Sequence, residues 1–547
     1  NAMGGREAGG LANMLAAHLD LEDPFHRAAV QTFWRSPAMP DRAGLKAVDL
    51  FRACDEGRIK ALWIMATNPA VSMPDADAVA AAIRRTPFVA VSDMSADSDT
   101  AALADVLLPA AGWGEKSGTV TNSERRISRQ RAFMPAAGEA RPDWRIIVDV
   151  AAAMGHGAAF AYSSPADIFR EYAALSTLAS GLGRGFDIGR FADIDDPGYD
   201  AMPPTLWPAP ADGGQRTRFF ADGGFFTEDR RARLNPTPVT QSDVETLGVF
   251  RLNSGRTRDH WHTMTRTGLS PRLSQHMAEP YLEMSPDDAA RVGLAAADLA
   301  WVENGQGKAI LRVLIADRAP RGVVFAPMHW SRANSGRGGI GALASSAVDP
   351  VSGQPDLKGA LVRVRPYRPA WHAFAVLRQD VRPKTAYWAK ARTIAGWRLE
   401  LADDRAPDDW ADFARRLFGV DEAAEIVTMQ DPKRGRIRLA AVEDGRVPDR
   451  GPDAGRGGAR APGGADGRGG ARRSPARRPT RRRPAGPRRH CLLLLLGRRE
   501  PDRAGHSDPG ARQRRGCRRG PQRRHELRLL PAGIAVAAAD GAQGGGG

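Results

Sequence analysis

The order of apolar and polar residues between positions 61 and 110 predicts an α/β unit. The apolar run at 61–66 suits a buried strand. Residues 75–85 predict a helix, because acidic residues occupy its first turn and arginines occupy its last. A second strand is expected over 88–92, and a second helix from Ser98 through the sequence SDTAALADVLL. This strand–helix–strand–helix order implies parallel strands.

Polar residues follow both predicted strands. Asn68 precedes Pro69, where the residue before a proline is biased out of helix, and Ser92-Asp93 ends the second strand. Since ligands of parallel sheets bind beyond the carboxyl ends of the strands, Asn68, Ser92 and Asp93 are candidate ligand contacts. A turn residue at Asn68 and a helix cap at Ser92-Asp93 are the structural alternatives.

From position 248 the pattern changes to β-structure. The sequence Asn304-Gly-Gln-Gly307 predicts a hairpin, since Asn-Gly readily takes positive φ. Ser285 is expected to cap a short helix that stops at Gly293. The predicted strands of this compact unit cover residues 248–252, 299–302, 309–315, 323–326 and 360–364.

The composition changes again towards the end of the chain. Residues 371–446, with Trp388, Trp397 and Trp410, predict a small folded extension. Residues 447–547 contain no Phe, Tyr or Trp and are dominated by Arg, Gly, Pro and Ala. Such a segment buries too little apolar area to offset its chain entropy, so a disordered arginine-rich tail is expected.

This tail also explains the formal net charge of +16. Residues 447–547 hold 24 arginines, no lysine and 8 acidic residues, so the remainder of the chain is neutral. A basic tail is typical of nucleic-acid binding. This one lacks interleaved aromatic residues and any recognised module, so nucleic-acid binding is the disfavoured alternative and no nucleic-acid partner is expected.

Cysteine content and hydropathy narrow the setting further. Cys54, Cys491 and Cys517 are too few and too scattered for a disulfide framework or a four-thiolate metal site, which fits a reducing compartment such as the cytoplasm. No apolar run approaches the roughly 18 residues of a membrane span, so no membrane partner is expected.

Six segments resemble the molybdenum enzymes of the dimethyl-sulfoxide-reductase family, and most of all the C-terminal half of bacterial assimilatory nitrate reductases. Because the interior of that family also reads Asn-Ala-Met where this chain starts, a truncated natural sequence is preferred over an expression scar. The segments occur in family order and are NAMGGREAGG from Asn1 (followed by LANMLAAH), LWIMATNPAVSMPDADAV from Leu62, WGEKSGTVTNSERRISRQR from Trp113, GEARPDW from Gly138, LNSGRTRDHWHTMTRTG from Leu252 and DPVSGQPDLK from Asp349.

The resemblance implies a fold and a cofactor. It implies a Rossmann-like α/β domain over 1–150, connecting helices and loops over 151–243, and a C-terminal β-barrel of the double-psi type over 244–370. The extension at 371–446 and the tail at 447–547 follow. In this family a bis(molybdopterin guanine dinucleotide) molybdenum cofactor is clasped between the α/β domain and the barrel.

The family's motifs also imply site residues. Asn68, Ser92 and Asp93 match contacts to a guanine nucleotide, and Arg256 offers a bidentate fork to phosphates. Arg6 matches an arginine near the substrate pocket, where a cation attracts nitrate, and is the candidate catalytic residue. The full set of implied cofactor-binding residues is Asn68, Ser92, Asp93, Lys116, Asp143, Ser254, Gly255, Arg256, His260, Trp261, His262, Thr263 and Lys358.

Some of these residues have other interpretations. His260 and His262 suggest a zinc site, but a spacing of two with no nearby cysteine or third histidine disfavours it, so no metal ligand is predicted. Lys116 and Lys358 would be ordinary surface lysines without the resemblance.

Two departures from the family limit what this chain is expected to do. The family's iron–sulfur cysteines and its molybdenum-ligating cysteine lie upstream of the motif at residue 1. The 4Fe-4S and molybdenum ligands are therefore expected in the complete enzyme but not here, and this chain alone is expected to be inactive. The second departure lies at residues 338–341, which read GGIG where the family carries an asparagine contact to the cofactor.

The tail is interpreted as an out-of-frame remnant of a 2Fe-2S domain. Family members often end in such a domain, with a Cys-x-Cys and a Cys-x-x-Cys pair. Residues 525–535 can be encoded so that a one-base shift reads TNCGSCLPEL, and the same shift of residues 490–495 permits IVCSCF. The two hits keep the family's order.

The predicted function is the reduction of nitrate to nitrite in nitrate assimilation. Electrons would come from an electron-donating reductase subunit or from ferredoxin or flavodoxin, through iron–sulfur clusters. A formate dehydrogenase or a periplasmic nitrate reductase is the same-family alternative. Residues 254–263 are expected on a loop that faces Asn68 and Ser92-Asp93 across an interdomain cleft, open on one side, with weak or no retention of cofactor.

Overall fold

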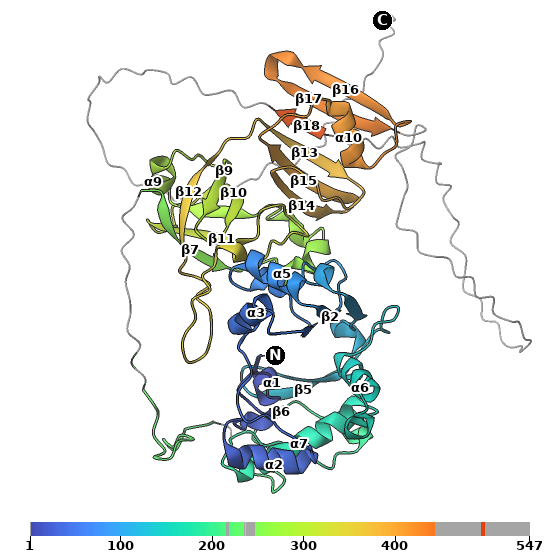
Figure 1. Ribbon diagram of the computed structural model, residues 1–547, viewed down its shortest axis with the longest axis vertical. Helices are drawn as coiled ribbons and strands as arrows, with labels where there is room; N and C mark the ends of the chain where they lie inside the picture. The colour runs from blue at the N-terminus through green and yellow to red at the C-terminus, as the bar shows by residue number, and fades with distance from the viewer. Residues whose placement is uncertain (1, 215–217, 235, 237–246, 443–493, 498–547) are drawn as a thin grey trace, which may run out of the picture. The chain divides into compact units, whose positions relative to one another are not determined.

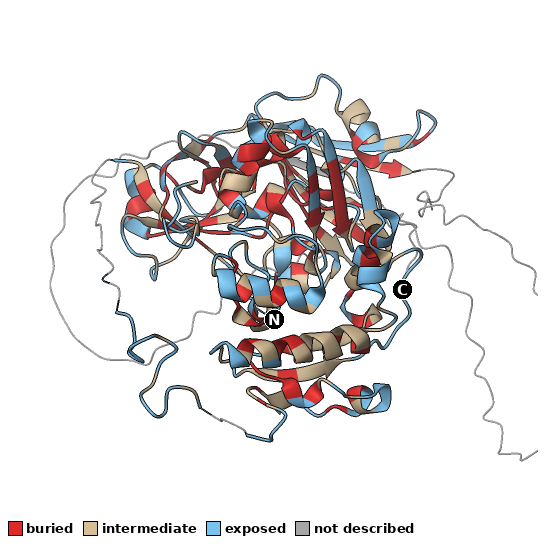
Figure 2. Cartoon of the chain, turned by 60° about the horizontal axis from the view of Figure 1, so that its bottom comes forward, coloured by how far each residue is buried: buried red, intermediate tan, exposed pale blue. Residues whose placement is uncertain are grey.

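The computed structural model describes residues 2–214, 218–234, 236, 247–442 and 494–497 (Figure 1). Within these ranges the chain contains a small parallel sheet with helices, a helix-rich part, a closed β-barrel and an antiparallel sheet. Figure 2 shows buried residues concentrated on the barrel strands and along the inner sides of the helices.

The parallel sheet confirms the α/β prediction. Its order is β1-β2-β3, and Ala90 of β2 pairs with Trp63 of β1 and with Val106 of β3. One face packs on helices through a core that includes Ile64, Val91 and Ile83. The elements are β1 (Ala61–Met65), β2 (Phe88–Asp93), β3 (Val106–Pro109), α3 (Ala47–Asp55), α4 (Pro69–Ser72) and α5 (Ala76–Arg85).

The helix predicted from Ser98 through DVLL is wrong. The structure has only the short 3-10 turn η2 (Ala101–Leu103) there, and the apolar residues that follow form β3. Asp105 at the start of this strand accepts a hydrogen bond from the Val89 backbone N–H at 2.7 Å. Pairing with β2 satisfies backbone groups along a whole strand edge, and this tertiary gain overrides a weak local helix propensity.

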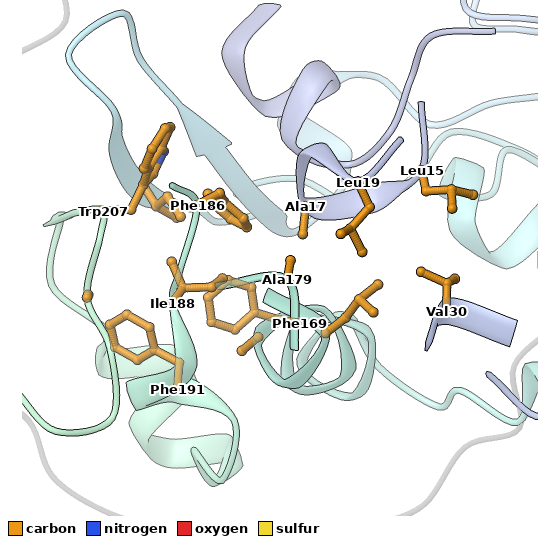
Figure 3. Close-up of a cluster of buried hydrophobic side chains, with 14 of the residues drawn as sticks. Leu15, Ala17, Leu19, Val30, Phe169, Ala179, Phe186, Ile188, Phe191 and Trp207 are labelled. Atoms are coloured by element: carbon orange, nitrogen blue, oxygen red, sulfur yellow. The ribbon is translucent and has the colours of Figure 1, made fainter. Parts of the chain in front are cut away.

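The helix-rich part has a core of its own (Figure 3). Phe169, Phe186, Ile188 and Trp207 converge there with Leu19. Residues before and after position 150 both contribute side chains to this core, for example Ile127 and Phe169. The domain boundary between 1–150 and 151–243 stays a prediction. Its elements are α1 (Ala2–Glu7), α2 (Pro24–Trp34), α6 (Asp143–Ala153), α7 (Pro165–Gly181), α8 (Asp196–Ala201), β4 (Gly118–Thr121), β5 (Arg126–Gln130) and β6 (Thr205–Leu206).

Six strands close into a barrel in the order β10-β8-β11-β7-β12-β9. The hairpin predicted at Asn304 is confirmed, with the Asn304 N–H donating to the Gly307 carbonyl, and Ser285 caps α9 as predicted. Strand β8 was not predicted, because its four residues carry no clear alternation. The elements are β7 (Val249–Gly255), β8 (Tyr281–Met284), α9 (Pro286–Arg291), β9 (Leu299–Glu303), β10 (Lys308–Ile315), β11 (Val323–Pro327) and β12 (Leu361–Tyr367).

The predicted extension is an antiparallel sheet with one covering helix. Trp371, Trp388 and Trp397 lie in its core. Strand β18 (Leu494–Gly497) pairs with β13 and β17, so these four residues depart from the predicted disordered tail; the rest of that tail lies outside the described residues. The other elements are β13 (Trp371–Leu377), β14 (Tyr387–Thr393), β15 (Gly396–Asp403), α10 (Trp410–Phe418), β16 (Glu425–Asp431) and β17 (Arg436–Val442).

Short 3-10 turns connect these elements. They are η1 (Ala16–His18), η3 (Trp113–Glu115), η4 (Gly157–Phe160), η5 (Gly189–Phe191), η6 (His262–Met264), η7 (Thr267–Leu269), η8 (Leu273–Gln275), η9 (Ile340–Leu343) and η10 (Pro432–Arg434).

Candidate functional site

A cavity of about 330 Å³ lies between α4 and the barrel. Residues 71–73 form one wall, and the other wall belongs to the barrel and to the segment that follows β7. We call residues 256–263 of that segment the cleft loop. The predicted contacts Ser254, Arg256, Trp261, His262 and Thr263 all line this cavity.

Asn68 joins the parallel sheet to the cleft loop. It precedes α4 and is buried, with 8% of its surface exposed. Its Oδ1 accepts hydrogen bonds from the Thr100 hydroxyl at 2.7 Å and from the Thr100 N–H at 3.1 Å. Its Nδ2 donates to the Thr263 hydroxyl at 3.0 Å. One amide side chain therefore fixes both a turn of the α/β unit and the end of the cleft loop.

Ser92 and Asp93 sit at the carboxyl end of β2, next to the strand that leads to Asn68. The Ser92 hydroxyl is buried and accepts a hydrogen bond from the Trp63 indole N–H at 2.9 Å. Asp93 accepts from the Ser95 N–H at 3.1 Å and from the Ser98 hydroxyl at 3.3 Å. Asp93 thus organises the turn after β2, Ser92 joins β2 to Trp63 of β1, and neither of them lines the 330 Å³ cavity.

Ser254 and Gly255 belong to the end of strand β7, so the prediction that they lie on a loop is wrong. The reason is that this segment pairs in parallel with β11, at Ala326 and Pro327. Lys358 donates to the Ser254 carbonyl at 2.5 Å, which brings this predicted contact to the same strand end.

Strained backbone and stacked rings shape the cleft loop. His262, Thr263 and Met264 have φ values of 38°, 51° and 61°, a conformation that is costly for residues other than glycine. The Arg256 guanidinium lies 4.9 Å from the centroid of the Trp261 ring, which stacks on His262 at 4.6 Å. Burial and the charges of Arg266 and Arg256 lower the pKa of His262. The loop thus presents a guanidinium, an indole and an imidazole at the cavity.

His260 points into the protein and not towards the cavity. It is 2% exposed, and its ring lies 5.4 Å from that of Trp330 and 6.1 Å from that of His329. Burial lowers its pKa. Its predicted role as a direct cofactor contact has no support in this geometry.

His329 was not singled out from the sequence, because it follows a strand without any motif. It lines the cavity, is 1% exposed, and its Nε2 accepts a hydrogen bond from the Thr257 backbone N–H at 3.0 Å. Burial, helped by the nearby His260 and Arg256, lowers the pKa of His329 to about 4. It is therefore neutral near pH 7.

The remaining predicted residues lie elsewhere in the described part of the chain. Lys116 and Asp143 form an ion pair with each other, and neither lines the 330 Å³ cavity. Arg6 is an exposed residue of α1.

A second cavity, of about 530 Å³, lies beside α1 and α7. Glu7 lines it and is 1% exposed; its carboxylate accepts hydrogen bonds from Thr121 at 2.8 Å and from the Trp207 indole at 2.6 Å. Burial raises the pKa of Glu7. Nothing in the sequence marks Glu7 beyond its place in the first family-like segment.

Neither a metal-binding cluster nor a membrane-spanning helix is present among the described residues. No group of three or more His, Cys, Asp or Glu side chains there is placed to hold a metal ion. No helix among them has both the length and the apolar character that crossing a membrane requires.

Family models match both parts that form the cleft. Residues 4–153 match the molybdopterin oxidoreductase model, and residues 250–361 match the molydopterin dinucleotide binding domain. These two segments of the chain are thus similar to domains of the molybdopterin oxidoreductases. The second match covers the barrel strands from Phe250 to Leu361, together with the cleft loop and His329.

Several relatives of the chain are nitrate reductases. The chain is 45% identical to the nitrate reductase of Klebsiella oxytoca, over 75% of this chain and 47% of that protein. It is 32% identical to the assimilatory nitrate reductase catalytic subunit of Bacillus subtilis, over 67% of this chain and 50% of that one. The F420-dependent formate dehydrogenase subunit alpha of Methanocaldococcus jannaschii is 31% identical, over 66% of this chain and 51% of that protein. The chain spans about half the length of these relatives.

A solved structure is also similar to part of this chain. Acetylene hydratase from Pelobacter acetylenicus matches with a TM-score of 0.45 at 18% identity, over 59% of this chain and 47% of that one.

The residues of the cleft fit a dinucleotide cofactor. Gly255 is the last residue of β7, directly before the cleft loop. A Cβ at this position would lie 2.7 Å from the Phe325 ring, so any side chain there would displace that ring. The cavity falls within the range of roughly 300–1,000 Å³ that is usual for small-molecule sites. Arg256 supplies a cation for phosphate, and the indole of Trp261 supplies a flat aromatic surface.

Proposed function

We propose that the cleft between α4 and the barrel binds the guanine nucleotide part of a molybdopterin guanine dinucleotide. The observation that carries this proposal is the hydrogen bond from Asn68, which follows β1, to Thr263 of the cleft loop, beside a cavity that Thr263 and Arg256 line. The fold assignment that goes with it is a Rossmann-like α/β domain and a double-psi barrel. Its support is the parallel pairing of β7 with β11 and of β8 with β10 inside a closed barrel.

Each residue has a stated role in this proposal. Arg256 binds a phosphate, since its guanidinium is exposed at the cavity and is held in place by Trp261. Asp93, which does not line the 330 Å³ cavity, is proposed to accept hydrogen bonds from the guanine N–H groups of a nucleotide that extends beyond the cavity to the end of β2. Lys358 holds the strand end through the Ser254 carbonyl. Lys116, Asp143 and Arg6 are proposed to act on other parts of the cofactor and on nitrate.

The proposed reaction is the reduction of nitrate to nitrite. When bound, the cofactor would supply oxygen-atom-transfer chemistry at molybdenum, with two electrons per nitrate coming from the electron-donating partner. The chain's own residues bind and orient that group and surround it with fixed dipoles. Nitrate is preferred over formate because the nitrate reductases compared are up to 45% identical to this chain, against 31% for the formate dehydrogenase.

Binding of guanosine 5′-diphosphate to the full chain tests the cleft. Titration calorimetry is expected to show saturable binding that Arg256→Ala weakens about tenfold, the loss of one charge-assisted hydrogen bond. Arg321→Ala is the matched control, because Arg321 is an exposed barrel arginine paired with Asp287, and it should change the affinity less than about twofold. Absence of saturable binding, equal affinity in Arg256→Ala, or zinc bound through His260 and His262 would each reject the assignment.

Sequencing the DNA that encodes this chain and the DNA that flanks it tests two proposals: that the substrate is nitrate, and that the tail is read in a shifted frame. Residues of the formate-dehydrogenase type at the metal site would reject nitrate. For residues 447–547 we propose a shifted reading frame of a 2Fe-2S domain. Resequencing should reveal a one-base difference that restores the Cys-x-Cys and Cys-x-x-Cys pairs, and an unchanged frame would reject this interpretation. Salt-sensitive DNA binding that is lost on removing the tail would instead favour the nucleic-acid alternative.

A further inference from the structure

We propose that His329 is a positioning residue that holds the start of the cleft loop, through its acceptance of the Thr257 backbone N–H. This inference deepens the proposed function, because the loop is useful for binding only if Arg256 and Trp261 are held at the cavity. No motif marks His329 in the sequence. Its place after β11, beside the first residues of the loop, gives it this role.

The His329 ring takes the place of a backbone acceptor at the end of the pairing between β7 and β11. Strands β7 and β11 run parallel up to the pair Gly255 and Pro327, and the Met328 N–H then donates to the Gly255 carbonyl at 3.0 Å. In a continuing parallel ladder the next donor, the Thr257 N–H, would bond a backbone carbonyl of the neighbouring strand. It bonds Nε2 of His329 at 3.0 Å instead. The ladder thus ends, and the chain turns into the cleft loop, without leaving this amide unpaired.

The contact fixes the loop at its first turn, and Asn68 fixes its end through Thr263. Between these two points lie Arg256, held against Trp261, and the strained residue His262. Strained backbone persists only where its surroundings determine it. The two anchors supply that constraint from opposite walls of the cavity.

The bond requires a neutral ring. Because Nε2 accepts, the ring proton of neutral His329 lies on Nδ1, which is buried and has no hydrogen-bond partner among the described residues. The groups that face it are His260, Arg256 and His262, whose charges oppose a second proton, and burial opposes it further. Protonation would turn Nε2 into a donor and break the contact with Thr257.

Two substitutions distinguish the effect of losing the hydrogen-bond acceptor from the effect of losing the imidazole ring. His329→Gln places an amide oxygen near the position of Nε2 and does not titrate, whereas His329→Leu keeps a similar volume without an acceptor. His156→Leu is the matched control, since His156 is exposed and precedes η4.

Hydrogen exchange of the full chain, without ligand, reads the contact directly. The Thr257 amide is expected to exchange at least about tenfold faster in His329→Leu than in wild type. It should keep wild-type protection in His329→Gln and His156→Leu. The exchange of peptides from β10 should be unchanged in all variants. After correction for intrinsic rates, wild-type protection at Thr257 should fall as the pH approaches 4, and His329→Gln should abolish that fall. Equal protection in His329→Leu and wild type, no recovery in His329→Gln, or an unchanged pH profile in His329→Gln would overturn the proposal. If His329→Leu does not fold, the pH profiles of wild type and His329→Gln decide it.

Titration with guanosine 5′-diphosphate then links the contact to binding. The affinity should fall about tenfold in His329→Leu and stay within about twofold of wild type in His329→Gln. If the exchange pattern holds but wild type binds no nucleotide, the proposed function fails while the positioning role stands. If wild type binds and His329→Leu binds equally well, the positioning role fails while the function stands.

Discussion

Replacing Asn68 by alanine should loosen the link between the parallel sheet and the cleft loop. The substitution removes three hydrogen bonds, two accepted from Thr100 and one donated to Thr263. Thr100 is fully buried, so its amide loses its acceptor where water cannot replace it. With about 1 kcal/mol for the Thr263 bond and about 2 kcal/mol for the stranded Thr100 amide, the expected local loss is about 3 kcal/mol.

A second substitution isolates the contact across the cavity. Thr263→Val removes only the hydroxyl that Asn68 donates to, and should cost about 1 kcal/mol. In a double-mutant cycle the two changes should couple by about 1 kcal/mol, because both remove the same bond.

Amide exchange is the suitable assay, since a chain with several cores has no single free energy of unfolding. In Asn68→Ala the Thr100 amide should exchange roughly thirtyfold faster, which corresponds to the about 2 kcal/mol of its own lost acceptor; in Thr263→Val it should keep wild-type protection. Asn122→Ala is the control, because Asn122 accepts two backbone hydrogen bonds in an exposed turn elsewhere. The reasoning fails if Thr100 protection changes by less than about twofold in Asn68→Ala, or if the cycle shows no coupling.

Three further predictions concern stability. Burial and the nearby Glu279 raise the pKa of Glu400 to about 7, so the folded state binds a proton that the unfolded state releases. Stability should therefore fall as the pH rises from 4.5 to 7, and Glu400→Gln should remove this loss, adding about 2 kcal/mol at pH 8 to the local free energy of opening that amide exchange reports for β15. Gly341→Ala would bring a Cβ to 2.5 Å from the Val71 carbonyl and should lower the thermal midpoint through a cost of about 2 kcal/mol; an unchanged midpoint would show that η9 shifts freely. Ser285→Ala removes the N-cap bond to Asp288 and should cost about 1 kcal/mol, visible as faster exchange in α9 while β14 is unaffected.

Local signals in the sequence determined much of the fold. The strands at 61–65 and 88–93, the helix from Ala76 and the hairpin at Asn304 all follow from nearest-neighbour chemistry, and each was predicted and confirmed. Apolar periodicity, charges at helix ends and an Asn-Gly turn act within a few residues, so they can be read without the tertiary structure.

The site was only partly visible in the same way. The family-like segments indicated Ser254, Arg256, Trp261, His262 and Thr263, which line one cavity, and Asn68, which donates a hydrogen bond to Thr263. Nothing local indicated His329, because its role depends on a partner 72 residues away in sequence. His260 carried the same motif signal as His262, and only the packing of the cleft loop turns one ring inwards and the other towards the cavity.

Tertiary pairing also decided the elements that local chemistry left ambiguous. The segment from Ser98 has a helical pattern, yet Val106–Pro109 becomes the third strand because the open edge of β2 offers it a full set of backbone partners. The short strand β8 exists because β10 and β11 flank it in the closed barrel. A sequence records the preferences of each segment, whereas unsatisfied backbone groups on a neighbouring strand are known only once that strand is in place.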